Sequence, residues 1–236
     1  MHNGSVELLK DGLRLDGRKP DELREISIKA GVIDNADGSA YLEWGNNRVL
    51  AAVYGPKEVI PKHDSDPNKA IVKALYTMSP FSSLEGHGRT TSRRAVEISK
   101  VTKEVFENVI LTNKFPETEI DIYIQILQAD GGTRAAGITA AAVALANAGI
   151  PMKDLVYGVS AGKVGDTVII DLNMLEDNYS DADMPVVVSP RSKEILLLQM
   201  DGNLTKEEFK KAIDMILDAG KIISKKQREA LIELYK

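Results

Sequence analysis

The sequence predicts a single α+β domain. Segments with the spacing of strands and segments with the spacing of helices interleave from one end of the chain to the other, and no stretch rich in Pro, Gly or Ser marks a linker. Of the 236 residues, 43% are hydrophobic and 28% are charged. This is the balance of a protein that can bury a core of its own.

The first third of the chain has the pattern of β-strands. Apolar and alternating runs are separated there by short turns that contain glycine, which is typical of neighbouring strands. Two polar loops are predicted after them: Pro56–Asn68, which holds three prolines, and Ser82–Thr91, which holds two glycines. The expected strands are Glu25–Val32, Ser39–Trp44, Asn47–Tyr54 and Ala70–Met78.

Two helices are predicted in the middle of the chain. The first, Arg93–Leu111, has apolar side chains at helical spacing and follows Ser92, a suitable N-cap. The second, Thr133–Ala148, follows a corner with two glycines and ends before Gly149. Since the second helix is apolar on nearly every side, we expect it to be buried between layers.

Strands are predicted for most of the remaining chain, up to a C-terminal helical segment. That segment, about residues 205–236, begins with Thr205 and Glu208 at the spacing of a capping box. The expected strands are Glu119–Leu127, Val156–Lys163, Thr167–Leu172, Met184–Val188 and Ile195–Met200.

The composition excludes several classes of function. The chain has no cysteine and only three histidines, which excludes a disulfide scaffold, a thiolate metal site and a cysteine nucleophile. The first residues lack the apolar core of a secretory signal, and no apolar run is long enough to span a bilayer. We therefore expect a cytoplasmic protein without membrane contact. The net charge of −5 argues at first sight against a nucleic-acid partner.

Three arginines lie where a helix ordinarily disfavours them. Arg93 and Arg94 fall in the first turn of one predicted helix, and Arg134 falls in the first turn of the other, although cations there oppose the helix dipole. A bound anion would reverse this effect, because free backbone N–H groups and an arginine fork suit a phosphate. The alternative is that these arginines are solvated or pair with a nearby acid such as Glu97.

A cluster of five carboxylates lies within thirteen residues that contain no Lys or Arg. We single out Asp177 and Asp183, because carboxylates that lie close together repel and one of them can then hold a proton near neutral pH and act as a general acid. Alternatively, the cluster binds Mg²⁺ or is a solvated loop. The five residues are Asp171, Glu176, Asp177, Asp181 and Asp183.

The predicted loops in the first half of the chain carry a local positive charge. Between Lys57 and Lys103 there are nine Lys or Arg residues against five Asp or Glu residues. The overall negative charge therefore hides a region with a balance of +4. Lys62, His63 and Arg89 lie on these loops, where they could contact a phosphate backbone.

Four strings of residues together carry a family likeness. The strongest is LQADGGTR at 127–134, followed by the acidic segment 171–185, LDGR at 15–18, and SRR with EISK within 92–100. These strings resemble the RNase PH family, and the first resembles its phosphate-binding signature. The likeness extends from about Gly12 to the C-terminal segment. It is nearest to the catalytic RNase PH-like subunit of the archaeal exosome.

The resemblance implies a fold of mixed β-sheets packed with helices in layers, with about residues 1–13 as an N-terminal extension. It also implies a 3′-to-5′ exoribonuclease that uses inorganic phosphate as co-substrate and releases nucleoside diphosphates. The implied partners are the 3′ end of a single-stranded RNA, a related inactive RNase PH-like subunit that alternates with this chain in a six-membered ring, and RNA-binding cap proteins.

The resemblance also implies roles for single residues. Gly132, Thr133 and Arg134 would hold the attacking phosphate, and Arg94 would help them. Asp177 would be the catalytic carboxylate that protonates the leaving 3′ oxygen. Together with the charge of the loops, the resemblance predicts RNA-binding residues at Lys62, His63, Arg89 and Arg93.

The role of the second carboxylate is less specific. By resemblance, Asp183 would assist Asp177 or take part in binding Mg²⁺. A metal ion at this place would be held by Asp177 and Asp183 together.

Three other interpretations fit parts of the sequence. The first is a bacterial-type RNase PH, which trims tRNA 3′ ends and assembles without a second kind of subunit. The second is a non-catalytic ring subunit that only binds RNA. The third is a metal-dependent hydrolase built on the acidic cluster, which would release monophosphates without added phosphate.

Overall fold

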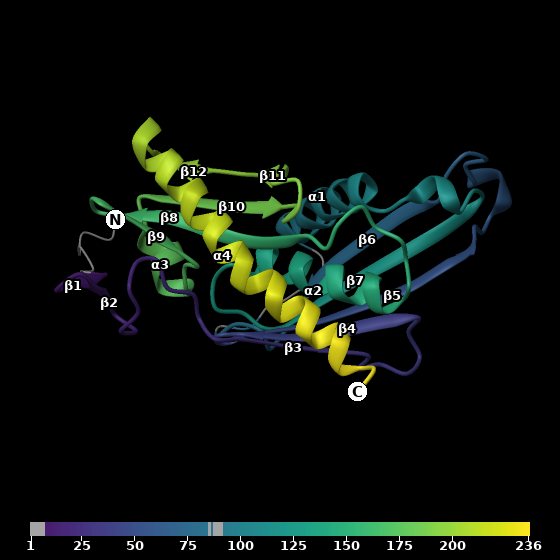
Figure 1. Ribbon diagram of the computed structural model, residues 1–236, viewed down its shortest axis with the longest axis horizontal. Helices are drawn as coiled ribbons and strands as arrows, with labels where there is room; N and C mark the ends of the chain where they lie inside the picture. The colour runs from purple at the N-terminus through teal and green to yellow at the C-terminus, as the bar shows by residue number, and fades with distance from the viewer. Residues whose placement is uncertain (1–7, 85, 87–91) are drawn as a thin grey trace.

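The chain folds into two β-sheets with helices between and beside them (Figure 1). The structure is a computed structural model that describes residues 8–84, 86 and 92–236. The first sheet has the strand order β3-β4-β5-β7-β6. In this sheet β6 runs parallel to β7, and the other neighbours are antiparallel. Its strands are β3 (Ile26–Ala30), β4 (Gly38–Trp44), β5 (Asn47–Glu58), β6 (Ile71–Met78) and β7 (Thr118–Gln128).

The second sheet comes from the C-terminal half of the chain. Its order is β11-β10-β8-β9, with β12 also paired to β10, and all of these pairs are antiparallel. A separate hairpin of β1 (Leu9–Lys10) and β2 (Leu13–Arg14) falls in and just after the predicted N-terminal extension. The strands of the second sheet are β8 (Tyr157–Val164), β9 (Thr167–Ile170), β10 (Ala182–Val188), β11 (Ile195–Leu198) and β12 (Asp201–Gly202).

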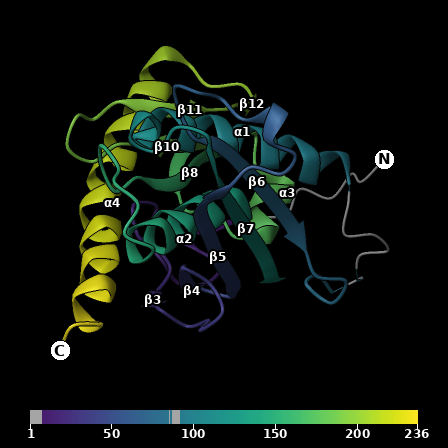
Figure 2. The ribbon, with the colours of Figure 1, turned by 90° about the vertical axis from the view of Figure 1, so that its right-hand side faces the viewer.

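The helices fill and flank the space between the sheets. The helix α2 packs against strands of both sheets, α1 packs on β6 and β11, and α4 packs on β8, β9 and β3 (Figures 1 and 2). None of the helices in the described part of the chain is long and apolar enough to cross a membrane. Their bounds are α1 (Arg93–Val109), α2 (Thr133–Asn147), α3 (Met174–Tyr179) and α4 (Lys206–Glu233).

One hydrophobic cluster joins the two sheets around α2. Trp44 and Ile126 reach it from the first sheet, and Val159 and Val186 reach it from the second. The prediction that α2 is buried is confirmed, because every residue from 135 to 145 of this helix is buried. The predicted α+β class and the packing of sheets and helices in layers are confirmed as well.

Besides the short strands β1, β2 and β12, two segments differ from the prediction. The strand β5 continues to Glu58, although a loop was expected from Pro56. The pairing of β5 with β7 shifts between Tyr54 and Lys57, and a proline is tolerated at such an irregularity. The helix α3 was not predicted at all, since its residues were seen only as part of an acidic run. Most of the expected loop at 82–91 lies outside the described residues.

Candidate active site

The glycine corner, Asp130-Gly131-Gly132, joins β7 to α2 and is fixed from two sides. Gly131 and Gly132 have φ values of +69° and +67°, a region that favours glycine. A Cβ atom on Gly131 would lie 2.5 Å from the carbonyl carbon of Asn173. From the sheet, Asn47 Nδ2 donates to the oxygen of Gly131 and Asn47 Oδ1 accepts from the N–H of Asp130, both at 2.7 Å. The start of α2 therefore has a fixed position against the start of α3.

The helix α2 begins without a side-chain cap. Its N-cap residue is Gly132, which has no side chain to bond the N–H groups of the first turn. Thr133 and Arg134 follow as the first two residues of the helix. Free N–H groups at the positive end of the helix dipole, beside a guanidinium group, form a place where a phosphate fits.

Arg134 has two partners among the residues that the structure describes. Its Nη1 donates to Gln199 Oε1, and its Nη2 lies 3.7 Å from Glu97 Oε1. Gln199 Nε2 in turn donates to Glu97 Oε1 at 2.8 Å. The pairing with Glu97 that the sequence offered as an alternative is therefore present. A contact of this length to a half-exposed carboxylate is weak, so an anion at the start of α2 can compete for Arg134.

The other two arginines lie at the start of α1. Ser92 caps this helix by accepting from the N–H of Ala95 at 3.1 Å, and Arg93 and Arg94 are exposed in the first turn. The charge of Arg94 lowers the pKa of Asp183, as does the charge of Arg134. Arginines from two helix starts therefore act on the same carboxyl group.

Asp171 belongs to the acidic cluster but serves the fold. It is buried with φ +56°. Its Oδ1 accepts from Arg24 Nη2 at 2.6 Å, and its Oδ2 accepts from Trp44 Nε1 at 2.9 Å. Burial alone would raise the pKa of Asp171, but the charge and the hydrogen bonds of Arg24 outweigh it and hold the pKa below its ordinary value. Asp171 is therefore ionised and fixed in place.

Two more members of the cluster have structural partners. Glu176 Oε1 accepts from Arg14 Nε at 2.7 Å, and its Oε2 accepts from the N–H of Asn173 at 2.9 Å in the capping box of α3. Asp181 Oδ2 accepts from the N–H of Gly165 at 2.9 Å. Three of the five carboxylates are thus occupied by contacts that hold the fold together.

Asp177 on α3 and Asp183 on β10 are the remaining two. In the described part of the chain, neither forms an ion pair within 4.0 Å. Burial raises the pKa of Asp183 to about 7, and the negative charge of Asp177 adds to the rise, while Arg134 and Arg94 lower it. The structure thus brings together the carboxylates that the sequence singled out, and with a pKa of about 7 Asp183 can hold a proton near neutral pH.

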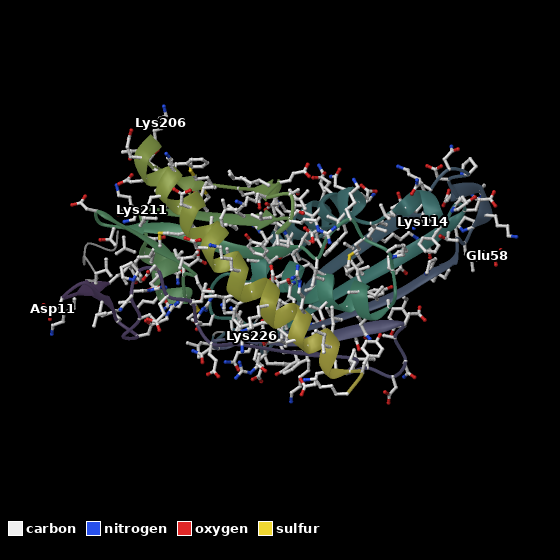
Figure 3. All side chains as sticks on the ribbon, in the orientation of Figure 1. Asp11, Glu58, Lys114, Lys206, Lys211 and Lys226 are labelled. Carbon is white, nitrogen blue, oxygen red and sulfur yellow. The ribbon has the colours of Figure 1, made fainter. Side chains whose placement is uncertain are left out.

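Two of the four expected RNA-binding residues lie elsewhere, whereas Arg93 is next to Arg94 at the start of α1. Lys62 and His63 form a 3₁₀ turn, Lys62–Asp64, and their side chains are 83% and 80% exposed. Lys62 Nζ lies 2.8 Å from Glu58 Oε1. Glu58 is at one end of the long axis in Figure 3, whereas α3 is toward the other end in Figure 1. Within one chain these residues are not brought to the carboxyl pair. Arg89 lies outside the described residues.

Mg²⁺ fits this site only in part. Within the described ranges, no group of three or more His, Asp or Glu side chains could hold a metal ion. Asp177 and Asp183 supply two carboxylates, and Mg²⁺ is commonly bound by one or two carboxylates together with water and substrate phosphates. The donor set therefore fits a Mg²⁺ ion that is shared with a substrate.

Sequence reasoning missed several residues that shape the site. Arg14, Arg18 and Arg24 reach the acidic segment from the N-terminal part of the chain. Gln199 holds Arg134, and Tyr76 bonds the side chain of Thr133. Their partners are distant in the sequence, so no local spacing could reveal them. The only signal in the sequence was the LDGR string, which contributed to the family resemblance but did not reveal these contacts.

The structure is an α+β fold in which arginines from two helix starts influence one member of a carboxyl pair. The sequence matches the 3′ exoribonuclease family, domain 1, over residues 22–151 and domain 2 of the same family over residues 154–218. The chain belongs to this family, known as RNase PH. The predicted family is thereby confirmed.

Relatives from archaea are similar over nearly the whole chain. The exosome complex component Rrp41 of Thermoplasma acidophilum is 52% identical over 237 residues, which cover 100% of this chain and 96% of the relative. The exosome complex component Rrp41 of Thermococcus kodakarensis is 54% identical over 226 residues, which cover 96% and 91%.

Solved structures share the fold. Rice (Oryza sativa) Rrp46 superimposes with a TM-score of 0.82 at 29% identity, over 91% of this chain and 98% of that chain. A chain of the Archaeoglobus fulgidus exosome with RNA bound to the active site has a TM-score of 0.80 at 22% identity, over 92% and 93%. The predicted RNase PH-like fold is confirmed.

Proposed function

We propose that this chain is the catalytic subunit of an archaeal-type exosome ring and degrades RNA from its 3′ end with inorganic phosphate, releasing nucleoside diphosphates. One observation carries the proposal. Arg134 lies in the first turn of α2, whose N-terminus has no side-chain cap and suits an anion, and the charges of Arg134 and Arg94 lower the pKa of the partly buried Asp183. Family membership and the archaeal relatives, which are named exosome components, support it.

The first half of the site holds the attacking phosphate. The N–H groups at Gly132 and the start of α2, the hydroxyl of Thr133, and the guanidinium groups of Arg134 and Arg94 would surround it. An oxygen of this phosphate forms a bond to the phosphorus of the last linkage in the RNA, and the bond from that phosphorus to the 3′ oxygen breaks. Such a transfer depends chiefly on positioning and on neutralising charge.

The second half of the site supplies a proton to the leaving 3′ oxygen. Asp183 holds a proton near neutral pH, and the titration of two interacting carboxyls belongs to the pair. We assign delivery of the proton to Asp177, with Asp183 as its source. Because phosphate rather than water attacks, the term hydrolase does not describe the reaction. When bound, a Mg²⁺ ion held by Asp177 and Asp183 would supply positive charge at the reacting phosphates.

RNA contacts would extend beyond the site of reaction. Lys62 and His63 are exposed near the end of the molecule that is remote from α3, where they would contact the RNA backbone without reading its sequence. Arg89 and Arg93 are proposed to join them. An alternating ring with a related inactive subunit would bring such contacts and the site onto one RNA path. The ring, the cap proteins and the cytoplasmic location stay predictions.

The two alternatives within the family differ in assembly and in chemistry. A subunit that only binds RNA has no need of Asp177, Asp183 and Arg134, and all three are present and gathered in one place. A bacterial-type RNase PH would assemble into a hexamer from this chain alone. Size-exclusion chromatography of the purified chain distinguishes the two assemblies, since a self-sufficient hexamer would contradict the exosome assignment.

The experiment that tests the proposal identifies products. The chain is mixed with its related partner subunit and a uniformly labelled single-stranded RNA, with and without inorganic phosphate. We expect nucleoside diphosphates in the presence of phosphate and intact RNA in its absence. Equal degradation without phosphate, or release of monophosphates, would contradict phosphorolysis and favour the metal-dependent hydrolase.

A further inference from the structure

Tyr76 on β6 touches both of the helices that carry the arginines. It is 1% exposed. Its backbone N–H donates to Ser99 Oγ of α1 at 2.9 Å, and its side-chain hydroxyl donates to Thr133 Oγ1 of α2 at 2.9 Å. One buried residue of the first sheet therefore bonds a residue near the start of each helix.

Both bonds end on residues that are themselves fixed. Ser99 Oγ also donates to the carbonyl oxygen of Ala95, one turn earlier in α1, at 2.7 Å. Thr133 is the first residue of α2 and is 4% exposed. Tyr76, at one position of β6, thus sets the spacing between the first turn of α1, which carries Arg94, and the first turn of α2.

The bond to Thr133 also decides where the threonine proton points. A threonine hydroxyl has one proton to donate and two lone pairs that accept. Since Thr133 Oγ1 accepts from Tyr76, its own proton is directed away from the tyrosine. No acceptor for that proton occurs among residues 8–84, 86 and 92–236. The uncapped start of α2 is where an anion would supply one.

The protonation state of Tyr76 is consistent with this direction. Burial raises the pKa of Tyr76, while the bond to Thr133 and the charges of Arg94 and Arg134 lower it by less. The phenol therefore keeps its proton at neutral pH and stays a donor.

We propose that Tyr76 is a positioning residue for phosphate: it turns the hydroxyl proton of Thr133 toward the bound phosphate and fixes the distance between the starts of α1 and α2. This inference rests on the proposed function and names a residue that the family resemblance did not supply. Because Tyr76 acts through Thr133, its loss affects phosphate binding more than the chemical step.

The test removes only the hydroxyl. Tyr76→Phe keeps the buried ring and the backbone bond to Ser99. In the assembled enzyme we expect the KM for phosphate to rise about five-fold, the size of one lost hydrogen bond. The kcat at saturating phosphate and the KM for RNA should stay within about two-fold. A matched control is Tyr157→Phe, an equally buried tyrosine whose hydroxyl bonds the carbonyl oxygen of Ile216. It should leave the KM for phosphate unchanged.

A double-mutant cycle separates positioning from a general loss of structure. Thr133→Val removes the hydroxyl that Tyr76 orients, so adding Tyr76→Phe should raise the KM for phosphate no further. Additive effects of the two changes, or an unchanged KM in Tyr76→Phe, would overturn the inference.

The failure of the inference can be told apart from the failure of the proposed function. A wild-type enzyme without phosphate-dependent turnover would overturn both. A wild-type enzyme that needs phosphate, together with a Tyr76→Phe enzyme of unchanged KM, would overturn only the role of Tyr76. Calorimetric titration of the assembled enzyme with inorganic phosphate gives the same comparison without turnover, with a Kd about five-fold weaker expected for Tyr76→Phe.

Discussion

Asp171 and Asp183 lie in the same short acidic segment and have opposite environments. Asp171 is buried deeper, yet Arg24 and Trp44 bond its carboxylate and its pKa lies below the ordinary value. Asp183 has no ion pair in the described part of the chain, and burial with the charge of Asp177 raises its pKa to about 7. Bonded cations, more than depth of burial, decide which carboxylate is charged.

The difference indicates that Asp171 supports the fold, whereas Asp183 is available for chemistry. Asp171 connects the N-terminal part of the chain, through Arg18 and Arg24, to the segment that carries α3. Asp183 stays without a bonded cation and therefore retains a proton. Among the described residues, the acidic segment thus bonds three of its carboxylates and leaves Asp177 and Asp183 without a cation, which is the pattern expected where a protein gives up local stability for function.

Asp177→Asn should have the largest effect on activity. The amide keeps the shape of the side chain but cannot deliver a proton, so kcat should fall by about 1,000-fold or more. RNA affinity, measured by fluorescence anisotropy, should stay within about two-fold, because the change removes no positive charge. The matched control Asp181→Asn alters an exposed carboxylate of the same segment and should retain activity. Loss of RNA binding in Asp177→Asn would mean that its role is misassigned.

Asp171→Asn should have the largest effect on stability. It leaves the buried guanidinium group of Arg24 without its counter-charge, which costs about 3–5 kcal/mol of unfolding free energy. Urea denaturation measures the loss, and Asp214→Asn, at an exposed position of α4, provides a control expected to change little. A loss below about 1 kcal/mol, the size typical of an exposed pair, would contradict the structural role of Asp171.

Arg134→Ala should chiefly weaken the use of phosphate. Loss of a charged hydrogen-bond donor is expected to raise the KM for phosphate about 30-fold. The KM for RNA serves as the internal comparison and should change little. If the KM for phosphate stayed the same while RNA affinity fell, Arg134 would belong to the RNA contacts.

Glu97→Gln should act in the opposite direction and more weakly. Its carboxylate competes with phosphate for Arg134 at 3.7 Å, so neutralising it should lower the KM for phosphate about two-fold, as expected for a weak pair. Steady-state kinetics at several phosphate concentrations measure the effect. A raised KM would show that Glu97 positions Arg134 instead of competing for it.

The pH dependence of stability should distinguish the two carboxylates. Asp183 binds a proton in the folded protein up to about pH 7, whereas in the unfolded chain it loses the proton near pH 4. Between these values the folded state binds more protons, so this group makes the free energy of unfolding fall as pH rises. Asp171 contributes with the opposite sign: its stabilisation is present above its ordinary pKa and is lost as pH falls through its lower folded pKa.

Asp183→Asn should therefore reduce the decline in the free energy of unfolding as the pH rises. Urea denaturation of the wild type at pH 5 and pH 8 should show lower stability at pH 8, and the variant should show a smaller difference. An identical difference in both proteins would contradict the raised pKa of Asp183. This measurement needs no phosphate, which itself titrates in the same range.

The sequence predicted the helices that carry the site better than the side-chain contacts within it. The starts of α1 and α2, with their arginines, followed from helical spacing, an N-cap serine and paired glycines, which are local signals. The helix α3 was missed, although Asn173 and Glu176 have the spacing of the capping box that forms there. Its six residues are too few to show a period.

Long-range pairs were beyond any local signal. Arg24 and Asp171 are 147 positions apart, and Tyr76 and Thr133 are 57 apart. Charge and spacing could therefore mark five acids as one cluster but could not divide them into bonded and unbonded groups. The sequence analysis singled out Asp177 and Asp183 and the family resemblance gave them roles, and the partners of the other three carboxylates give a physical reason for that choice.

The most direct test of this division is a pH titration of the side-chain carboxyl ¹³C signals in the folded protein. Asp171→Asn and Asp183→Asn variants assign the two resonances. The signal of Asp183 should titrate near pH 7, and that of Asp171 should remain in the ionised position down to below pH 4. An Asp183 signal that titrates near pH 4 would contradict the account, as would an Asp171 signal that titrates above it.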